Sequence, residues 1–290
     1  MDAPIATAAP AKIIGALWGS SHPVPTLVVT ALAGALGVAV GLDAGRLALL
    51  IVAVFAGQLS VGISNDALDA ARDRAVGRLD KPLARGDATV RQAWVAASAA
   101  LAVALVLSAF LGWRMLAAHA VMLGGAWAYN AGLKATAASL VPFLVSFGVF
   151  PSLAPLSAAV PAYAQWWAWI AGAALGAGFH LTNVLPDLDD DARTGVRGLP
   201  HRISARMSAL LACLAVVGGA VAVLLGPVNG DIGRVPVAAW VFFGAVLAVV
   251  AVVVALALLR PTARVLHRLI MLSALVLAVQ LVASGGALAA

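Results

Sequence analysis

Two short segments of the chain hold most of its carboxylates. All twelve acidic residues are Asp, and seven of them lie in these segments: Asp66, Asp69, Asp73, Asp187, Asp189, Asp190 and Asp191. Aligned with an offset of 118 residues, both segments follow the pattern N-x-x-x-D-x-x-x-D-x-x-x-G-x-x-x-x-P, which begins at Asn65 and at Asn183. The shared pattern predicts an internal repeat around a central site, with motifs at 65–82 and 183–200.

The spacing of these residues indicates the chemistry they would do. Residues at positions i, i+4 and i+8 line one face of a helix, so Asn65, Asp69 and Asp73 would share a face. Carboxylates gathered at a membrane-embedded helix end are costly unless a cation lies between them. Mg²⁺ prefers one or two carboxylates together with phosphate oxygens. The two motifs therefore predict a site for Mg²⁺ and a diphosphate.

Basic residues near the first motif would neutralise the remaining phosphate charge; they are Arg72, Arg78, Lys81 and Lys134. Two other interpretations use the same acidic residues. The clusters would be solvated loop charges that follow helices, or they would line a cation pathway in a transporter. The match between two clusters argues against the first interpretation. The adjacent basic residues argue against the second, because they suit a phosphate better than a bare cation.

The composition indicates the environment of this site. Of the 290 residues, 63% are apolar and only 10% are charged, against about 25% charged in a soluble domain. A soluble enzyme is therefore excluded, and the long apolar runs predict an all-α integral membrane protein. Nine runs are long enough to cross: 24–42, 45–64, 93–111, 115–131, 137–157, 164–186, 207–226, 235–259 and 265–288. Within the sixth run, Gly172, Gly176 and Gly178 predict close helix packing.

The placement of Lys and Arg predicts the topology. With the N-terminus inside, 15 of the 18 basic residues fall in inside segments, and only Arg46, Arg114 and Arg234 lie outside. This asymmetry favours nine transmembrane helices with an N-in, C-out orientation in the cytoplasmic (inner) membrane, and both Asp motifs then face the cytoplasm. Membrane lipids, not nucleic acid, explain the net charge of +6. No linker divides the chain, so residues 1–290 are predicted to form one transmembrane domain.

These residues resemble the UbiA superfamily of intramembrane prenyltransferases over nearly the whole chain. The N-D-x-x-D-x-x-x-D motif at Asn65, the Asp-rich motif at 187–191 and the nine runs carry the resemblance. The stretch from Asp80 to Gly86 is similar to the family's R-P-L-P-x-G, with Lys81 in place of Arg. The first position of the second motif is often Asp in the family and is Asn183 here. Tyr129 with Lys134 resembles an aromatic-plus-basic pair on the fourth span.

The resemblance implies a helical fold around a central cavity in which Mg²⁺ and a polyprenyl or other allylic diphosphate bind. It assigns catalysis to Asp66, Asp69, Asp73, Asp187 and Asp191. All of these except Asp66, together with Asn65, would hold the metal. The residues that would contact the diphosphate or the acceptor are Asn65, Arg72, Arg78, Lys81, Tyr129, Lys134 and Asn183. The implied activity is prenyl transfer to an aromatic or lipid acceptor, as in quinone biosynthesis.

The acceptor stays open at the level of sequence. Family members that use a hydroxybenzoate often have an Arg near the first span, but the stretch Leu17–Pro23 has none, and only His22 could serve there. A neutral phenol, a quinone precursor or another lipid are therefore alternatives to a carboxylated acceptor. A membrane terpene cyclase of the same fold, and a carrier for a cation or a phospholipid, are the alternative functions.

Overall fold

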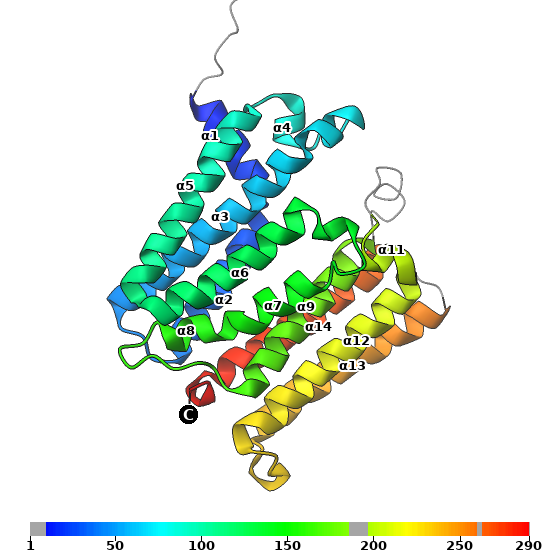
Figure 1. The fold of residues 1–290 in the computed structure, drawn as a ribbon. Coiled ribbons are helices and arrows are strands. Elements are labelled where there is room, and N and C mark those ends of the chain that lie inside the picture. The colour runs from blue at the N-terminus through cyan, green and yellow to red at the C-terminus, as the bar shows by residue number, and fades with distance from the viewer. Residues whose placement is uncertain (1–9, 186–196, 260–262, 290) are drawn as a thin grey trace, which may run out of the picture.

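The computed structural model describes residues 10–185, 197–259 and 263–289, and within these ranges the ordered elements are all helices. Most of the long helices run side by side as a bundle, with α1, α4 and α11 at one end and α8 and the C-terminus at the other (Figure 1). The predicted all-α architecture is therefore confirmed. The division into a single domain with two repeats remains a prediction.

The N-terminal half forms the following helices: α1 (Pro10–Ser20), α2 (Pro23–Ala39), α3 (Ala44–Ala75), α4 (Pro82–Arg85), α5 (Val90–Leu111), α6 (Trp113–Ala131), α7 (Val141–Val149) and α8 (Leu153–Leu156). The C-terminal half forms α9 (Trp166–Asn183), α11 (Leu199–Ile203), α12 (Ala205–Leu225), α13 (Val237–Leu259) and α14 (Ala263–Ala283). The short 3₁₀ turn η1 (Leu133–Ala135) follows α6 and carries Lys134.

Each of the nine apolar runs contains at least one helix, but the helices differ in how well they suit a membrane crossing. Among the described residues, α3, α5, α12, α13 and α14 are each long and apolar enough to span, and α1 with α2 would make a sixth, broken span. The helices α6 and α9 carry buried polar residues such as His119 and His180, and α7 is short. The long apolar helices fit an integral membrane protein, and the count of nine spans remains a prediction.

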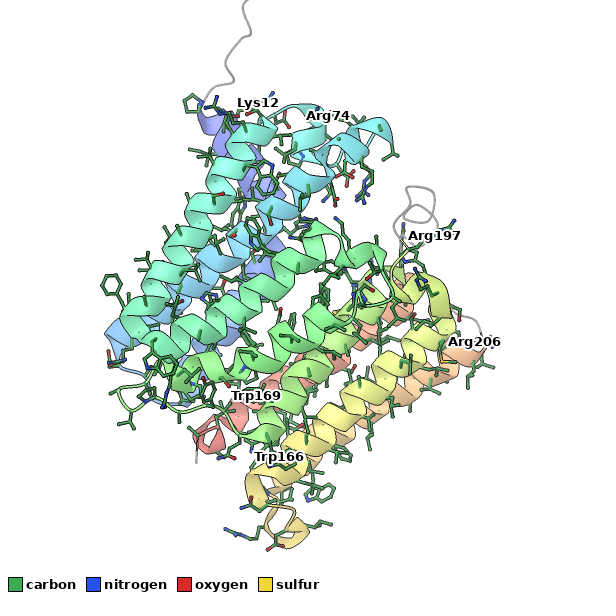
Figure 2. All side chains as sticks on the ribbon, in the orientation of Figure 1. Lys12, Arg74, Trp166, Trp169, Arg197 and Arg206 are labelled. Carbon is green, nitrogen blue, oxygen red and sulfur yellow. The ribbon has the colours of Figure 1, made fainter. Side chains whose placement is uncertain are left out.

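The two ends of the bundle differ in their side chains. Lys12, Arg74 and Arg206 lie at one end, whereas Trp166 and Trp169 lie toward the other (Figure 2). In membrane proteins, Lys and Arg gather on one side, and Trp is enriched where helices meet either membrane interface.

The largest core cluster lies where α9 packs against α7, α12 and α14. Two glycines on α9 make the contact with α7 possible. A Cβ at Gly172 would collide with the backbone carbonyl of Phe147, and a Cβ at Gly176 would meet the carbonyl of Phe143 at 2.5 Å. These positions confirm the prediction that glycines in the sixth run permit close helix packing.

A break at Ser21 and His22 separates α1 from α2, and the two helices meet there at 68°. Pro23 begins α2 and lacks the N–H that would continue the α1 ladder. Hydroxyl groups replace the lost pairing, because Ser21 Oγ donates to the Trp18 carbonyl and Thr26 Oγ1 donates to the Ser21 carbonyl. These two bonds satisfy carbonyl groups at the break, and His22 lies at its corner.

We predict that Gly172→Ala lowers the free energy of unfolding by about 1–3 kcal/mol, because the new methyl group meets backbone that cannot rotate away. Gly218→Ala on α12 is the matched control, since no atom lies within 4 Å of its added Cβ. Thermal unfolding of both variants in the same detergent checks the prediction. Equal melting temperatures for the two variants would show that α7 and α9 are not tightly packed.

Candidate functional site

The candidate site lies at the C-terminal end of α3, where the first Asp motif completes the helix. The carbonyl end of a helix carries partial negative charge and disfavours acidic residues. Nevertheless Asp73, in the last turn of α3, is only 4% exposed, and Asp66, two turns earlier, is 1% exposed. Cations from other parts of the chain offset this cost, and they define two clusters on adjoining faces of α3.

The first cluster gathers oxygen ligands around the ammonium of Lys134. Nζ of Lys134 donates to both carboxylate oxygens of Asp69, at 2.6 and 2.7 Å, and to Oδ1 of Asn65 at 3.3 Å. Asn65 and Asp69 thus share a face of α3, as their spacing predicts. The two side chains Lys134 and Asp69 are each 13% exposed, so the pair is largely shielded from solvent.

Arg72 extends this cluster toward the end of α3. Its guanidinium lies 3.0 Å from Asp69 Oδ2 and 3.8 Å from Asp73 Oδ1. The predicted face of Asn65, Asp69 and Asp73 is therefore bordered by two cations. An arrangement of alternating carboxylates and cations can receive both a metal ion and the phosphate oxygens that the metal bridges.

The second cluster joins Asp66 to His22 and Lys81. Asp66 Oδ1 accepts hydrogen bonds from Nζ of Lys81 at 2.7 Å and from Nε2 of His22 at 3.0 Å. The sequence predicts His22 only as a possible contact for the acceptor, and it does not predict the pairing with Asp66. The Ser-His-Pro sequence is a signal for a break before Pro23, but it does not say which helix this break meets.

Local backbone geometry places His22 against α3. A Cβ at Gly62, one turn before Asp66, would collide with the carbonyl of Ser21, so the glycine allows the α1–α2 corner to touch the helix. His22 itself has φ 54° and ψ 70°, a left-handed conformation that non-glycine residues adopt at a cost. The close approach brings the imidazole within reach of the Asp66 carboxylate.

The second Asp motif is described only at its two flanks, because Asp187 and Asp191 lie outside the described residues. Asn183 ends α9 and is exposed. After the motif, the chain returns beside η1: a Cβ at Gly198 would lie 2.6 Å from the Lys134 carbonyl, and the Leu199 N–H donates to Ser139 Oγ at 2.8 Å. The segment that follows the second motif therefore packs next to the turn that holds Lys134.

The remaining predicted site residues lie elsewhere. Arg78 forms a two-pronged hydrogen-bonded pair with Asp80, and this contact holds the pKa of Asp80 at about 2. Tyr129 packs edge-on against Phe143 and His180, with ring centroids 4.9 and 5.7 Å away. The structure thus brings Asn65, Asp69, Asp73, Arg72 and Lys134 together, and it pairs Lys81 with Asp66 in a separate cluster.

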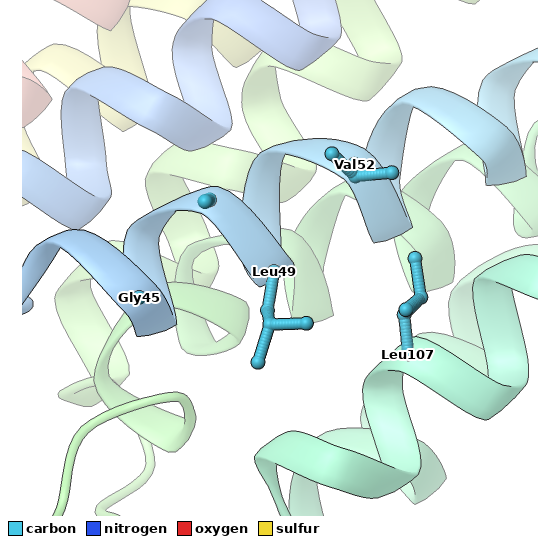
Figure 3. Close-up of a pocket in the computed structure, with 5 residues that line it drawn as sticks. Gly45, Leu49, Val52 and Leu107 are labelled. Atoms are coloured by element: carbon cyan, nitrogen blue, oxygen red, sulfur yellow. The ribbon is translucent and has the colours of Figure 1, made fainter.

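Two hollows bear on the location of the site. One, of about 290 Å³, is lined by residues that include Gly19, His22, Asp80 and Lys81, beside the second cluster. The other, of about 300 Å³, has an entirely apolar lining that includes Gly45, Leu49 and Leu107, between α3 and α5 (Figure 3). Gly45 and Asn65 are about 30 Å apart along the helix axis, so the apolar hollow lies far from the charged clusters.

The long apolar helices fit an integral membrane protein, and its Asp-rich helix end with surrounding cations forms a charged site at one end of the bundle. The sequence profile of the UbiA prenyltransferase family matches residues 24–260. The chain therefore belongs to this family, and the resemblance drawn from its motifs is confirmed. A search of curated proteins gave no match.

Solved structures share the fold at low sequence identity. A digeranylgeranylglyceryl phosphate synthase has a TM-score of 0.72 and 14% identity, covering 95% of this chain and 99% of its own. A UbiA homologue from Archaeoglobus fulgidus bound to GPP and Mg²⁺ has a TM-score of 0.69 and 14% identity, with 92% and 98% covered. A UbiA homologue from Aeropyrum pernix K1, in its apo form, has a TM-score of 0.69 and 17% identity, with 93% and 98% covered.

We predict that Asp66→Ala lowers the free energy of unfolding by about 3–5 kcal/mol, because it leaves the Lys81 ammonium, only 18% exposed, without its counter-charge. Asp80→Ala removes the partner of Arg78 in an exposed pair and should cost less than about 1 kcal/mol. Unfolding monitored by tryptophan fluorescence compares the two. A small effect of Asp66→Ala would mean that water solvates Lys81.

Proposed function

We propose that the chain transfers a prenyl group from a polyprenyl or other allylic diphosphate to an aromatic or lipid acceptor, in a Mg²⁺-dependent reaction at the cytoplasmic face of the inner membrane. One observation carries the proposal: Asn65, Asp69 and Asp73 are held at a shielded helix end between two cations, Lys134 and Arg72. Belonging to the UbiA family supports prenyl transfer as the reaction.

The residues of the first cluster suit magnesium. The Lys134 ammonium, itself a cation, already lies between the oxygens of Asn65 and Asp69, and hard oxygen ligands of this kind are those that Mg²⁺ takes. Asn65, Asp69 and Asp73 would hold one ion, and Asp187 and Asp191 of the second motif would hold another. Bound Mg²⁺ would supply charge that stabilises the departing diphosphate. The A. fulgidus homologue bound to GPP and Mg²⁺ supports this assignment.

The protein's own cations would neutralise the phosphate charge that remains. Prenyl transfer breaks the bond between C1 and the bridging oxygen, whose electron pair leaves with the diphosphate. The acceptor forms the new bond to C1 and loses one proton, so the products are prenylated acceptor, diphosphate and a proton. Lys134 and Arg72, already placed beside Asp69, would shift to the phosphate oxygens and offset their growing charge.

The flanks of the second motif support a site shared by both motifs. Gly198 lies against the Lys134 carbonyl, and the Leu199 N–H donates to Ser139 Oγ. The chain that follows the second motif therefore lies beside the first cluster. Asn183 ends the helix that leads into that motif. The proposal places the diphosphate between the two motifs, with Arg78, Lys81 and Tyr129 toward its outer edge or the acceptor.

We predict that Asp69→Asn and Asp187→Asn each reduce transfer by about 100-fold or more, because each removes a charged metal ligand and leaves the phosphate charge less neutralised. Asn at position 69 keeps an oxygen for the Lys134 ammonium, so this variant should stay folded. The measurement is release of diphosphate from labelled geranyl diphosphate with Mg²⁺ and a panel of phenols, repeated with EDTA. Arg234→Ala, near the opposite end of the bundle, is the matched control and should retain full activity.

The products separate the proposed function from its alternatives. Acceptor conjugates indicate a transferase, whereas a hydrocarbon formed without acceptor would indicate a cyclase. Absence of diphosphate release in every condition would indicate a carrier and contradict the proposal.

We predict that the site faces the cytoplasm, and labelling of single cysteines tests this orientation. The substitution C213A removes the chain's one cysteine, which is buried. A single cysteine is then introduced as R74C, beside the site, or as R234C, in the predicted outside loop. In spheroplasts, an impermeant maleimide should label R234C, and it should label R74C only after the membrane is opened. Labelling of R74C in intact spheroplasts would place the site on the outer face.

A further inference from the structure

The pocket of about 290 Å³ beside the α1–α2 corner adjoins the proposed donor site without being part of it. Asn65 and Asp66 are consecutive on α3, so their side chains leave the helix about 100° apart. Asn65 faces Lys134, whereas Asp66 faces His22 and Lys81. A ligand in this pocket would therefore lie next to a diphosphate held by the first cluster, as an acceptor must.

Asp66 determines which nitrogen of His22 is available to a ligand. An ionised carboxylate only accepts hydrogen bonds, and Asp66 is paired with Lys81 at 2.7 Å. Nε2 of His22 lies 3.0 Å from Asp66 Oδ1 and 3.5 Å from Lys81 Nζ, and the shorter contact, to an oxygen that only accepts, assigns the ring hydrogen to Nε2. In the neutral ring, Nδ1 is then an acceptor, and it has no hydrogen-bond partner among the described residues. The side chain is 39% exposed.

The charges around the pocket also argue for a neutral ligand. The two residues of the lining that are always charged, Lys81 and Asp80, each have a partner outside it: Lys81 is paired with Asp66, and Asp80 with Arg78. The charges of these four side chains sum to zero. A carboxylate that binds here would exchange hydrating water for a cation that already has its counter-charge.

We propose that this pocket binds the acceptor and selects an uncharged hydroxyl compound, whose O–H donates to Nδ1 of His22. Asp66 and Lys81 act as positioning residues, since they hold the imidazole and its tautomer. The inference rests on the proposed function, because it takes the ligand of this pocket to be the acceptor. Binding of the ligand can be measured without turnover. It reduces the acceptors left open by the sequence to phenols and alcohols without a carboxylate.

The test compares a neutral phenol, 4-propylphenol, with an anionic phenol, 4-hydroxybenzoate, at pH 7, and the signal from empty nanodiscs is subtracted to remove partition into lipid. The full chain in nanodiscs is loaded with Mg²⁺ and unreactive geranyl S-thiolodiphosphate, and binding of each phenol is titrated. We expect 4-propylphenol to bind at least about 10-fold more tightly than 4-hydroxybenzoate. Tighter binding of 4-hydroxybenzoate, or no binding of either phenol, overturns the inference.

Three variants of His22 connect the selectivity to this residue. His22→Gly suits the left-handed backbone and should weaken 4-propylphenol binding about 10-fold without unfolding the protein. His22→Asn, which tolerates the same backbone and keeps an acceptor atom, should restore part of the loss. His22→Arg adds an uncompensated cation and should improve 4-hydroxybenzoate binding relative to 4-propylphenol about 10-fold.

Donor affinity separates the two proposals. The thiolodiphosphate should bind all three His22 variants within about 2-fold of the parent, and Asp69→Asn should weaken it strongly. Equal loss of donor and phenol in His22→Gly would place His22 in the donor site and overturn the inference. A chain that selects neutral phenols through His22 but releases no diphosphate from geranyl diphosphate would contradict only the proposed function.

Discussion

A helix that ends in buried carboxylates must be neutralised by cations, and this requirement organises the charged end of the bundle. Asp73 lies in the last turn of α3, where the helix dipole is already negative, and Asp69 and Asp66 lie about one and two turns before it. Lys134 reaches them from η1, and Lys81 from the segment before α4. Because each cation comes from a different part of the chain, the electrostatic demand at one helix end also ties the surrounding elements to α3.

The same arrangement gives neighbouring residues of one motif different partners. Consecutive positions on a helix face different neighbours, so Asn65 and Asp66 serve separate clusters although they are adjacent in sequence. A donor site with metal ligands and an acceptor site with a positioned imidazole can therefore share two turns of one helix. Under the proposed function, this closeness would place the donor and the acceptor next to each other.

Much of the candidate site follows from the sequence, and the rest does not, for identifiable reasons. The spacing of Asn65 and Asp69 predicts a common face, which Lys134 confirms by contacting both. The pairing of His22 with Asp66 could not be predicted, because it spans 44 positions and depends on a broken helix that approaches Gly62. Long-range pairs of this kind leave no periodic pattern in the chain.

The sequence by itself determined the helical membrane class, the family and the position of the first acidic motif, because apolar run length and i, i+4 spacing are local properties. Only the tertiary structure decided which cation meets which carboxylate: Lys134 with Asp69, and Lys81 and His22 with Asp66. Such pairing depends on how separate helices pack and where their corners bend, and packing is a property of the whole fold.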